Sequence, residues 1–182
     1  MNFGGDKAWP APQANWPQIA ARGWPPPRGF DGLPQEAVVE GPAVILVSPV
    51  DPSFGIRVRR RIELQPDQPV MTITTRYEKI SGPPVEVGVW IITQLKNPVT
   101  TQAIFADSPL PGETEVRQLN ESPAVFQLEG GRLTLARDPD RNHKIGVPAG
   151  ALIWIGGKEI LRIDSPLVAG GKYPDGGSRA EI

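Results

Sequence analysis

The residues best suited to binding chemistry stand close together near the start of the chain. Asp6, Lys7 and Trp9 follow the glycine pair Gly4–Gly5. A tryptophan ring is a flat apolar surface that can stack on a sugar ring, whereas aspartate and lysine supply an acceptor and a donor for its hydroxyl groups. Glycine allows a ligand to approach the backbone closely. The spacing therefore predicts a carbohydrate-binding surface on which Trp9 stacks, Asp6 accepts and Lys7 donates.

A plainer interpretation of the same residues stays open. Asp6 and Lys7 can form an ordinary charge pair in a turn, and Trp9 can be a core residue, as can Trp16 and Trp24 in the Trp/Pro stretches that follow. Burial separates the two interpretations, because a stacking ring must be reachable from solvent. Full burial of all three tryptophans among apolar neighbours would favour the core role.

Two further polar candidates belong to segments that are expected to be strands. Gln94 shares one side of the apolar segment 85–95 with Trp90, and a polar group on a central strand requires a hydrogen-bonding partner. Lys144 begins another strand. We therefore expect Gln94 and Lys144 to complete the carbohydrate site, and Trp90 to be a core residue. The opposite, buried face of the segment is expected to hold Val85, Val87, Val89 and Ile91.

The composition argues against several classes of partner. The 182 residues carry a net charge of −1 and no basic stripe, so a nucleic-acid partner is not expected. No apolar run approaches the roughly 20 residues of a membrane-spanning helix, so no membrane partner is expected. The lack of cysteine excludes disulfides and thiolate metal sites, and it leaves the compartment open, as the sequence also leaves the oligomeric state.

No metal or other cofactor is predicted. Asp138, Asp140 and Asn142 resemble the start of a calcium loop, but His143 stands where that loop requires glycine, and no glutamate closes it. We therefore interpret this acidic stretch as an ordinary loop.

Alternating apolar and polar residues predict antiparallel strands along most of the chain. The segments 56–64 and 71–79 alternate with period two, and the pairs Gly130–Gly131 and Gly156–Gly157 are typical of two-residue hairpin turns. Abundant glycine and proline disfavour long helices. These patterns predict an all-β fold, an antiparallel β-sandwich with negligible helix.

The domain organisation follows from the same patterns. We expect one β-sandwich domain over residues 1–182, with a Trp/Pro-rich loop over 1–35 and the antiparallel strands over 36–182. The arginines that share one face of the segment 56–64 are expected to form a solvated face paired with glutamates. These arginines are Arg57, Arg59 and Arg61, and the glutamates are Glu63 and Glu78.

Nine short motifs follow one another along nearly the whole chain: Gly4–Gln13, Trp24–Pro27, Phe30–Asp31, Val47–Pro49, Gly55–Arg61, Gly88–Trp90, Thr93–Gln94, Lys144–Gly146 and Tyr173–Gly177. In its order the series resembles a bacterial family of uncharacterised function in the galactose mutarotase-like superfamily. The resemblance implies a mutarotase-like β-supersandwich whose concave sheet binds a sugar, with the opening loop folded over it. It also implies that the chain is a fragment, lacking strands at both ends of the complete domain.

The resemblance also implies candidate catalytic residues. Aldose mutarotases open and reclose the sugar ring with a histidine acid and a glutamate base. Glu181, which follows the motif Tyr173–Gly177, is then the candidate base, and His143, the sole histidine, is the candidate acid.

Three functions therefore stay open. The first expectation is non-catalytic carbohydrate binding, which a single histidine favours over catalysis. The alternatives are an enzyme resembling aldose 1-epimerase and a structural sandwich with no small-molecule ligand. In the first two cases Asp6, Lys7 and Trp9 are expected to lie near Gln94 and Lys144.

Overall fold

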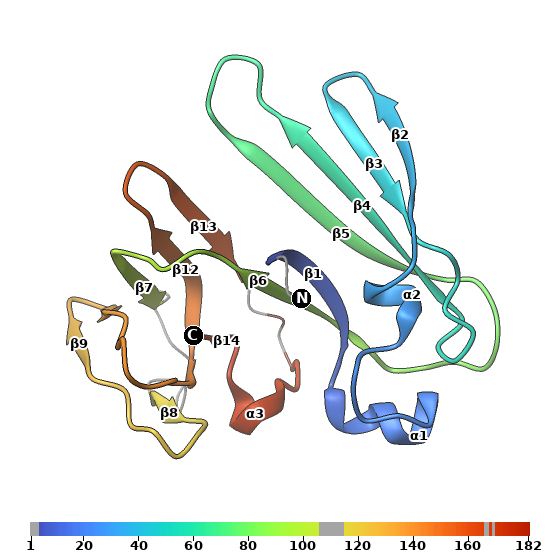
Figure 1. The fold of residues 1–182 in the computed structure, drawn as a ribbon. Helices are drawn as coiled ribbons and strands as arrows, with labels where there is room; N and C mark the ends of the chain where they lie inside the picture. The colour runs from blue at the N-terminus through green and yellow to red at the C-terminus, as the bar shows by residue number, and fades with distance from the viewer. Residues whose placement is uncertain (1–3, 106–114, 166–167, 169) are drawn as a thin grey trace. The chain divides into compact units, whose positions relative to one another are not determined.

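Antiparallel strands dominate the protein. The computed structural model describes residues 4–105, 115–165, 168 and 170–182. Every strand pairing in these residues is antiparallel, and the helices among them are short (Figure 1), so the predicted all-β fold is confirmed. The chain divides into two compact units, Met1–Gln94 and Leu95–Ile182. That one sandwich spans both of them stays a prediction.

The first unit contains a two-stranded sheet, β1–β6, and a four-stranded sheet in the order β2–β3–β4–β5. The period-2 alternation that predicted strands at 56–64 and 71–79 matches β4 and β5. The elements of the unit are β1 (Gly5–Ala11), a 3-10 turn (Gln13–Asn15), α1 (Trp16–Ala20), α2 (Arg28–Asp31), β2 (Glu36–Glu40), β3 (Ala43–Val47), β4 (Ile56–Leu64), β5 (Met71–Lys79) and β6 (Gly88–Gln94).

The opening segment differs from its prediction as a loop. Within residues 4–35 the chain forms β1, the 3-10 turn, α1 and α2. β1 pairs with β6 from Gly5 opposite Gln94 to Ala11 opposite Gly88. The prolines that suggested a loop do not prevent this pairing. Proline has no backbone N–H, and it is tolerated in an edge strand where that position makes no hydrogen bond to a neighbouring strand.

The core of the first unit fills the space between β1, α2 and the four-stranded sheet. Its buried residues include Ala8, Phe30, Phe54 and Val58. The prediction that Val89 is buried is wrong, since 44% of its surface is exposed. Val85, Val87 and Ile91, which were predicted on the same side, are partly buried and pack against this core.

The arginine face of β4 forms the predicted ion pairs. Arg57 Nε lies 2.6 Å from Glu78 Oε2, and Arg61 Nη2 lies 3.1 Å from Glu63 Oε1. Arg59 Nη2 is 3.7 Å from Glu40. These pairs are partly exposed, so solvent screens them and each is expected to contribute little to the stability of the fold.

The second unit contains a five-stranded sheet, β13–β12–β7–β10–β9, and a three-stranded sheet, β14–β11–β8. Apolar side chains from β7, β10, β11 and β12 form its core. The elements are β7 (Thr100–Phe105), β8 (Arg117–Gln118), β9 (Phe126–Glu129), β10 (Arg132–Leu135), β11 (Ile145–Val147), β12 (Ala149–Ile155), β13 (Ile160–Asp164), α3 (Pro174–Gly177) and β14 (Ala180–Glu181).

Candidate functional site

The pairing of β1 with β6 places three of the predicted binding residues on one face. Trp9 lies opposite Trp90, Lys7 opposite Ile92, and Gly5 opposite Gln94. Residues directly opposite one another in an antiparallel pair project from the same face, and so do residues two apart in one strand. Four residues therefore share one face of the β1–β6 pair: Lys7, Trp9, Trp90 and Gln94. We call these four residues, together with Trp24, the aromatic face.

Trp9 is the centre of the aromatic face. Its ring makes edge-to-face contacts with Trp16, Trp24 and Trp90, at centroid distances of 6.2, 5.4 and 5.7 Å. Trp9 and Trp16 are buried, and Trp16 Nε1 donates to the carbonyl of Pro10 at 2.7 Å, whereas Trp24 is 64% exposed. The burial criterion thus divides the tryptophans: Trp9 and Trp16 are core residues, and Trp24 offers a ring to solvent.

Two buried polar atoms of the aromatic face have no hydrogen-bonding partner among the described residues. They are Trp9 Nε1, a donor, and Gln94 Oε1, an acceptor. Most buried polar groups in proteins are hydrogen-bonded, and an unpaired one costs about 1–3 kcal/mol. A ligand with a hydroxyl group can satisfy either atom, so this pair of atoms is the strongest sign of a binding surface in the first unit.

Lys7 is held loosely beside Trp9. Its Nζ lies 5.7 Å from the centroid of the Trp9 ring, within range of a cation–π interaction, and 3.9 Å from Asp31 Oδ1. The Lys7 and Asp31 side chains are 26% and 27% exposed. A pair at this distance leaves the ammonium free to donate elsewhere.

Asp6 occupies the opposite face of β1, which corrects the expectation that it acts beside Lys7. Thr93 Oγ1 donates to its Oδ2 at 2.8 Å, and the Arg60 guanidinium donates to its Oδ1. Arg60 Nη1 also donates to the Asp6 carbonyl at 2.9 Å. With both carboxylate oxygens engaged, Asp6 fixes β1 onto the four-stranded sheet.

Sequence reasoning missed Arg60, although β4 carries a signal for it. In the period-2 alternation of the segment 56–64, Arg60 shares a side with the apolar residues Ile56, Val58, Ile62 and Leu64. Its side chain is only 10% exposed. A buried arginine requires an anionic partner, and Asp6 supplies it from 54 residues away.

The second unit brings Lys144, Asp175 and Glu181 together in what we call the carboxylate–lysine cluster. Lys144 Nζ lies 3.1 Å from Glu181 Oε2 and 3.3 Å from Asp175 Oδ2. Lys144 directly precedes β11, and Glu181 lies on β14 opposite Gly146 of β11. The sheet therefore positions two of the three groups.

Asp175 reaches the cluster through a tight turn. Its φ is +50°, in the left-handed region, and Gly176 and Gly177 that follow also have positive φ. Ser178 Oγ donates to the Asp175 carbonyl at 2.9 Å and holds the turn. Asp175 belongs to the motif Tyr173–Gly177 but was not among the predicted site residues, because only the turn brings it to Lys144.

The cluster changes the acid–base properties of its members. Burial, followed by a hydrogen bond with Asp175, raises the pKa of Glu181 to about 7. The hydrogen bonds with Glu181 and then Lys144 lower the pKa of Asp175. Burial opposes ionisation of Lys144, but the hydrogen bond and charge of Glu181 raise its pKa overall. At neutral pH Glu181 can therefore both hold and release a proton.

His143 is not free to act as the predicted acid. Its Nδ1 lies 3.1 Å from the carbonyl of Ser122, and its Nε2 lies 3.1 Å from Asp138 Oδ2. The side chain is 9% exposed, and none of its contacts involves Glu181. His143 thus holds the loop around Asp138, and no group of acidic or histidine side chains in the described residues has the arrangement of a metal site.

The predicted residues consequently divide between the two units. Lys7, Trp9 and Gln94 belong to the first unit, and Lys144 and Glu181 to the second. That Lys144 converges with the aromatic face stays a prediction.

Comparisons with known proteins returned no match to the chain, whether with family models, curated proteins or solved structures. None of the helices in the described ranges is long and apolar enough to cross a membrane. The resemblance to the galactose mutarotase-like superfamily therefore stays a prediction, and function must be argued from the residues of the two sites.

Proposed function

We propose that the protein binds a carbohydrate on the aromatic face of its first unit. The observation that carries the proposal is the pair of buried, unpartnered atoms, Trp9 Nε1 and Gln94 Oε1, on the face to which the exposed Trp24 ring belongs. A sugar combines hydroxyl groups, which both donate and accept, with an apolar ring face. The hydroxyl groups can pair with the two unpartnered atoms, and the apolar ring face can stack on Trp24.

Each residue then has a defined role in binding. Trp24 stacks on the sugar ring, a role first expected of Trp9, whose ring is buried beneath it. Trp9 Nε1 and Lys7 Nζ donate to sugar oxygens, and Gln94 Oε1 accepts from a hydroxyl group. Asp6 keeps β1 in place and takes no part in binding.

A purely structural role explains less of this surface. Core packing accounts for the burial of Trp9 and Trp16, but it leaves Trp24 exposed and two buried polar atoms unpaired. A core that only has to be stable has no reason to retain either feature.

Tryptophan fluorescence tests the proposal directly. We expect at least one sugar from a panel of neutral and acidic monosaccharides to change the emission, and Trp24→Ala to weaken its binding about tenfold, equivalent to about 1.4 kcal/mol. Trp154→Phe, which removes a tryptophan of the second unit, is the matched control and should leave the affinity unchanged. If no sugar binds, or if both variants lose affinity equally, the proposal is overturned.

A second candidate function, proton transfer of the aldose epimerase type, is favoured by the carboxylate–lysine cluster: Lys144 Nζ lies 3.1 Å from Glu181 Oε2, and burial raises the pKa of Glu181 to about 7. Glu181 would take the proton of the anomeric hydroxyl while the C1–O5 bond breaks and its electron pair goes to O5. Lys144, rather than His143, is the cation placed to protonate O5, and reclosure reverses these steps.

Exchange NMR between the two anomers of a sugar measures this activity. A general base typically contributes a factor of about 10²–10⁴, so Glu181→Gln should reduce the enzyme-dependent exchange by at least about 100-fold. Asp164→Asn, which breaks an exposed ion pair with Arg162 on β13, is the control. Exchange that does not depend on the protein, or that survives Glu181→Gln, would exclude this function.

A further inference from the structure

The aromatic face has an excess of hydrogen-bond donors over acceptors. Trp9 Nε1 is buried without an acceptor, and Lys7 Nζ has its nearest acid, Asp31, 3.9 Å away. Gln94 Oε1 is the one buried acceptor of this face that lacks a donor among the described residues. Both donors belong to one patch, since Lys7 Nζ lies over the Trp9 ring, 5.7 Å from its centroid.

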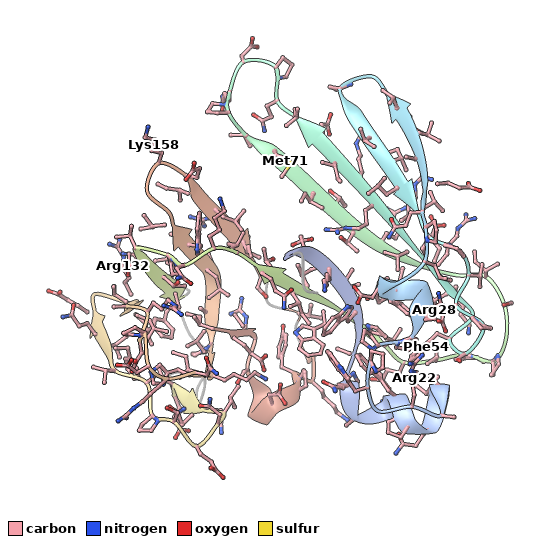
Figure 2. The ribbon with its side chains drawn as sticks, in the orientation of Figure 1. Arg22, Arg28, Phe54, Met71, Arg132 and Lys158 are labelled. Carbon is pink, nitrogen blue, oxygen red and sulfur yellow. The ribbon has the colours of Figure 1, made fainter. Side chains whose placement is uncertain are left out.

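A second cation belongs to the same stretch of chain. Arg22 follows α1 (Figure 2) and is two residues from Trp24, whose ring contacts Trp9. Its Nε is buried and has no hydrogen-bonding partner in the part of the chain that the structure describes. Buried N–H groups normally have a hydrogen-bonding partner, so Arg22 Nε is a further donor that the described residues leave unpaired.

Apart from the long ion pair between Lys7 and Asp31, no acid of the described residues in this unit pairs with these donors. Asp6 is held by Arg60 and Thr93 on the other face of β1. The cations on β4 are different, since Arg57 and Arg61 have carboxylate partners at 2.6 and 3.1 Å. The donors of the aromatic face are therefore available to an anion from outside.

The backbone leaves room for such a group beside Lys7. Gly5 precedes Lys7 by two residues on the same face, and no atom lies within 4 Å of the position that a Cβ atom would occupy there. Its φ of +94° is one that residues with side chains rarely adopt. Gly5 is exposed, so β1 is open to solvent at this position opposite Gln94.

We propose that the aromatic face selects a carbohydrate that carries a carboxylate, such as a uronic acid, over the corresponding neutral sugar. One carboxylate oxygen accepts from Lys7 Nζ and the other from Trp9 Nε1. The sugar ring stacks on Trp24, and one of its hydroxyl groups donates to Gln94 Oε1. Charge-assisted hydrogen bonds are about twice as strong as neutral ones, which gives the preference its physical basis. This inference rests on the proposed carbohydrate binding.

Isothermal titration of the whole chain with matched ligands tests the inference. The ligands are glucuronate and glucose, galacturonate and galactose, and acetate as a carboxylate without a sugar ring. We expect at least one uronate to bind about tenfold or more tightly than its neutral partner, and more tightly than acetate, with an affinity that falls as salt is added.

Three variants assign the preference to its residue. Lys7→Met should remove the preference for the uronate while retaining the thermal unfolding midpoint, and Lys7→Arg should restore it. Arg76→Gln, which removes one positive charge from the exposed side of β5, is the matched control and should leave the preference unchanged.

The outcomes separate this inference from the proposed function. Equal affinity for a uronate and its neutral partner would overturn the inference and leave carbohydrate binding intact. Acetate binding as tightly as the uronate, or an equal loss in Arg76→Gln, would also overturn it. If none of the sugars binds, the proposed function itself fails.

Discussion

The aromatic face and the carboxylate–lysine cluster differ in how their polar groups are satisfied. In the aromatic face, Trp9 Nε1 and Gln94 Oε1 are buried without partners, and Lys7 has one distant partner. In the cluster, each charged group is engaged by its neighbours, while burial, followed by the hydrogen bond with Asp175, raises the pKa of Glu181.

One small protein thus contains two different arrangements of polar groups, one unpaired and one mutually paired. Under the proposed function, the unpaired buried atoms bind a ligand, whereas mutually paired charges shift pKa values and can serve proton transfer or simply hold strands together. The predictions below test whether the two regions differ in this way.

The largest effect is expected from the framework beneath the aromatic face. Arg60→Met removes the guanidinium that pairs with Asp6, leaving a partly buried carboxylate without its cation. Breaking such a pair destabilises a protein by about 3–5 kcal/mol, which urea unfolding can measure. In the double variant with Asp6→Asn the loss should be smaller, since no charge is left unpaired. Additive losses would show that Asp6 and Arg60 do not interact.

The next effect is the pH dependence of the second unit. The folded-state pKa of Glu181 is about 7, above its ordinary value of 4.5, so the folded state binds the proton more tightly. Its contribution to stability is therefore full below about pH 4.5 and is lost as the pH rises through 7. At about 1.4 kcal/mol per pKa unit the loss is at most about 3 kcal/mol.

Glu181→Gln should flatten the unfolding free energy between pH 4.5 and 7, since the amide does not titrate. Asp175 affects the pH dependence of stability in the opposite direction. Its pKa is lowered in the fold, so its contribution to stability is lost only as the pH falls through that lower folded pKa. A parent protein whose stability rises from pH 4.5 to 7 through Glu181 would contradict this account of the cluster.

A smaller effect is expected where β11 meets the turn after α3. A Cβ atom at Gly146 would lie 2.7 Å from the Cβ of Ser178, closer than unstrained atoms approach. Gly146→Ala should therefore destabilise the protein by about 1–3 kcal/mol and move β14, which carries Glu181, away from Lys144. NMR titration of the Glu181 carboxyl should then show its pKa returning toward the ordinary value. An unchanged pKa would mean that this packing does not position Glu181.

The smallest effect on stability is expected at Lys7. Because its ion pair with Asp31 is long and partly exposed, Lys7→Ala should change the free energy of unfolding by no more than about 0.5 kcal/mol. The same substitution should weaken sugar binding in titration calorimetry, because it removes the donor that gives the preference for a uronate. Tight binding by this variant, or a large loss of stability, would remove Lys7 from the binding surface.

Local sequence patterns predicted much of the strand content. The alternation in β4 and β5 was sufficient, and the hairpin at Gly130–Gly131 joins Glu129 to Arg132 as predicted. The second glycine pair lies in a longer loop, since Ile155 pairs with Ile160 rather than with Lys158. Turn glycines thus identified both hairpins, but strand register decided the loop length.

Contacts distant in sequence account for what could not be predicted. β1 becomes a strand because β6 pairs with it from about eighty residues away, and the exposure of Val89 was likewise not predicted. Asp6 lies on the side of β1 that faces Arg60. The inward position of the Arg60 side chain follows from the pairing of strands in the sheet and not from the local sequence. Gln94 was found as a candidate because local strand alternation identifies it. Asp175 was not, because only the turn brings it to Lys144.

We propose that the unpaired atoms of the aromatic face bind a carbohydrate. The indole N–H signals in a ¹H–¹⁵N correlation spectrum report directly on that binding. During titration with the tightest-binding sugar, the account predicts that the Nε1–H signals of Trp9 and Trp24 shift with a common affinity while that of Trp154 in the second unit does not. A downfield shift of the Trp9 proton would be the sign of its new hydrogen bond. A Trp9 signal that stays unchanged while the sugar binds would contradict the account.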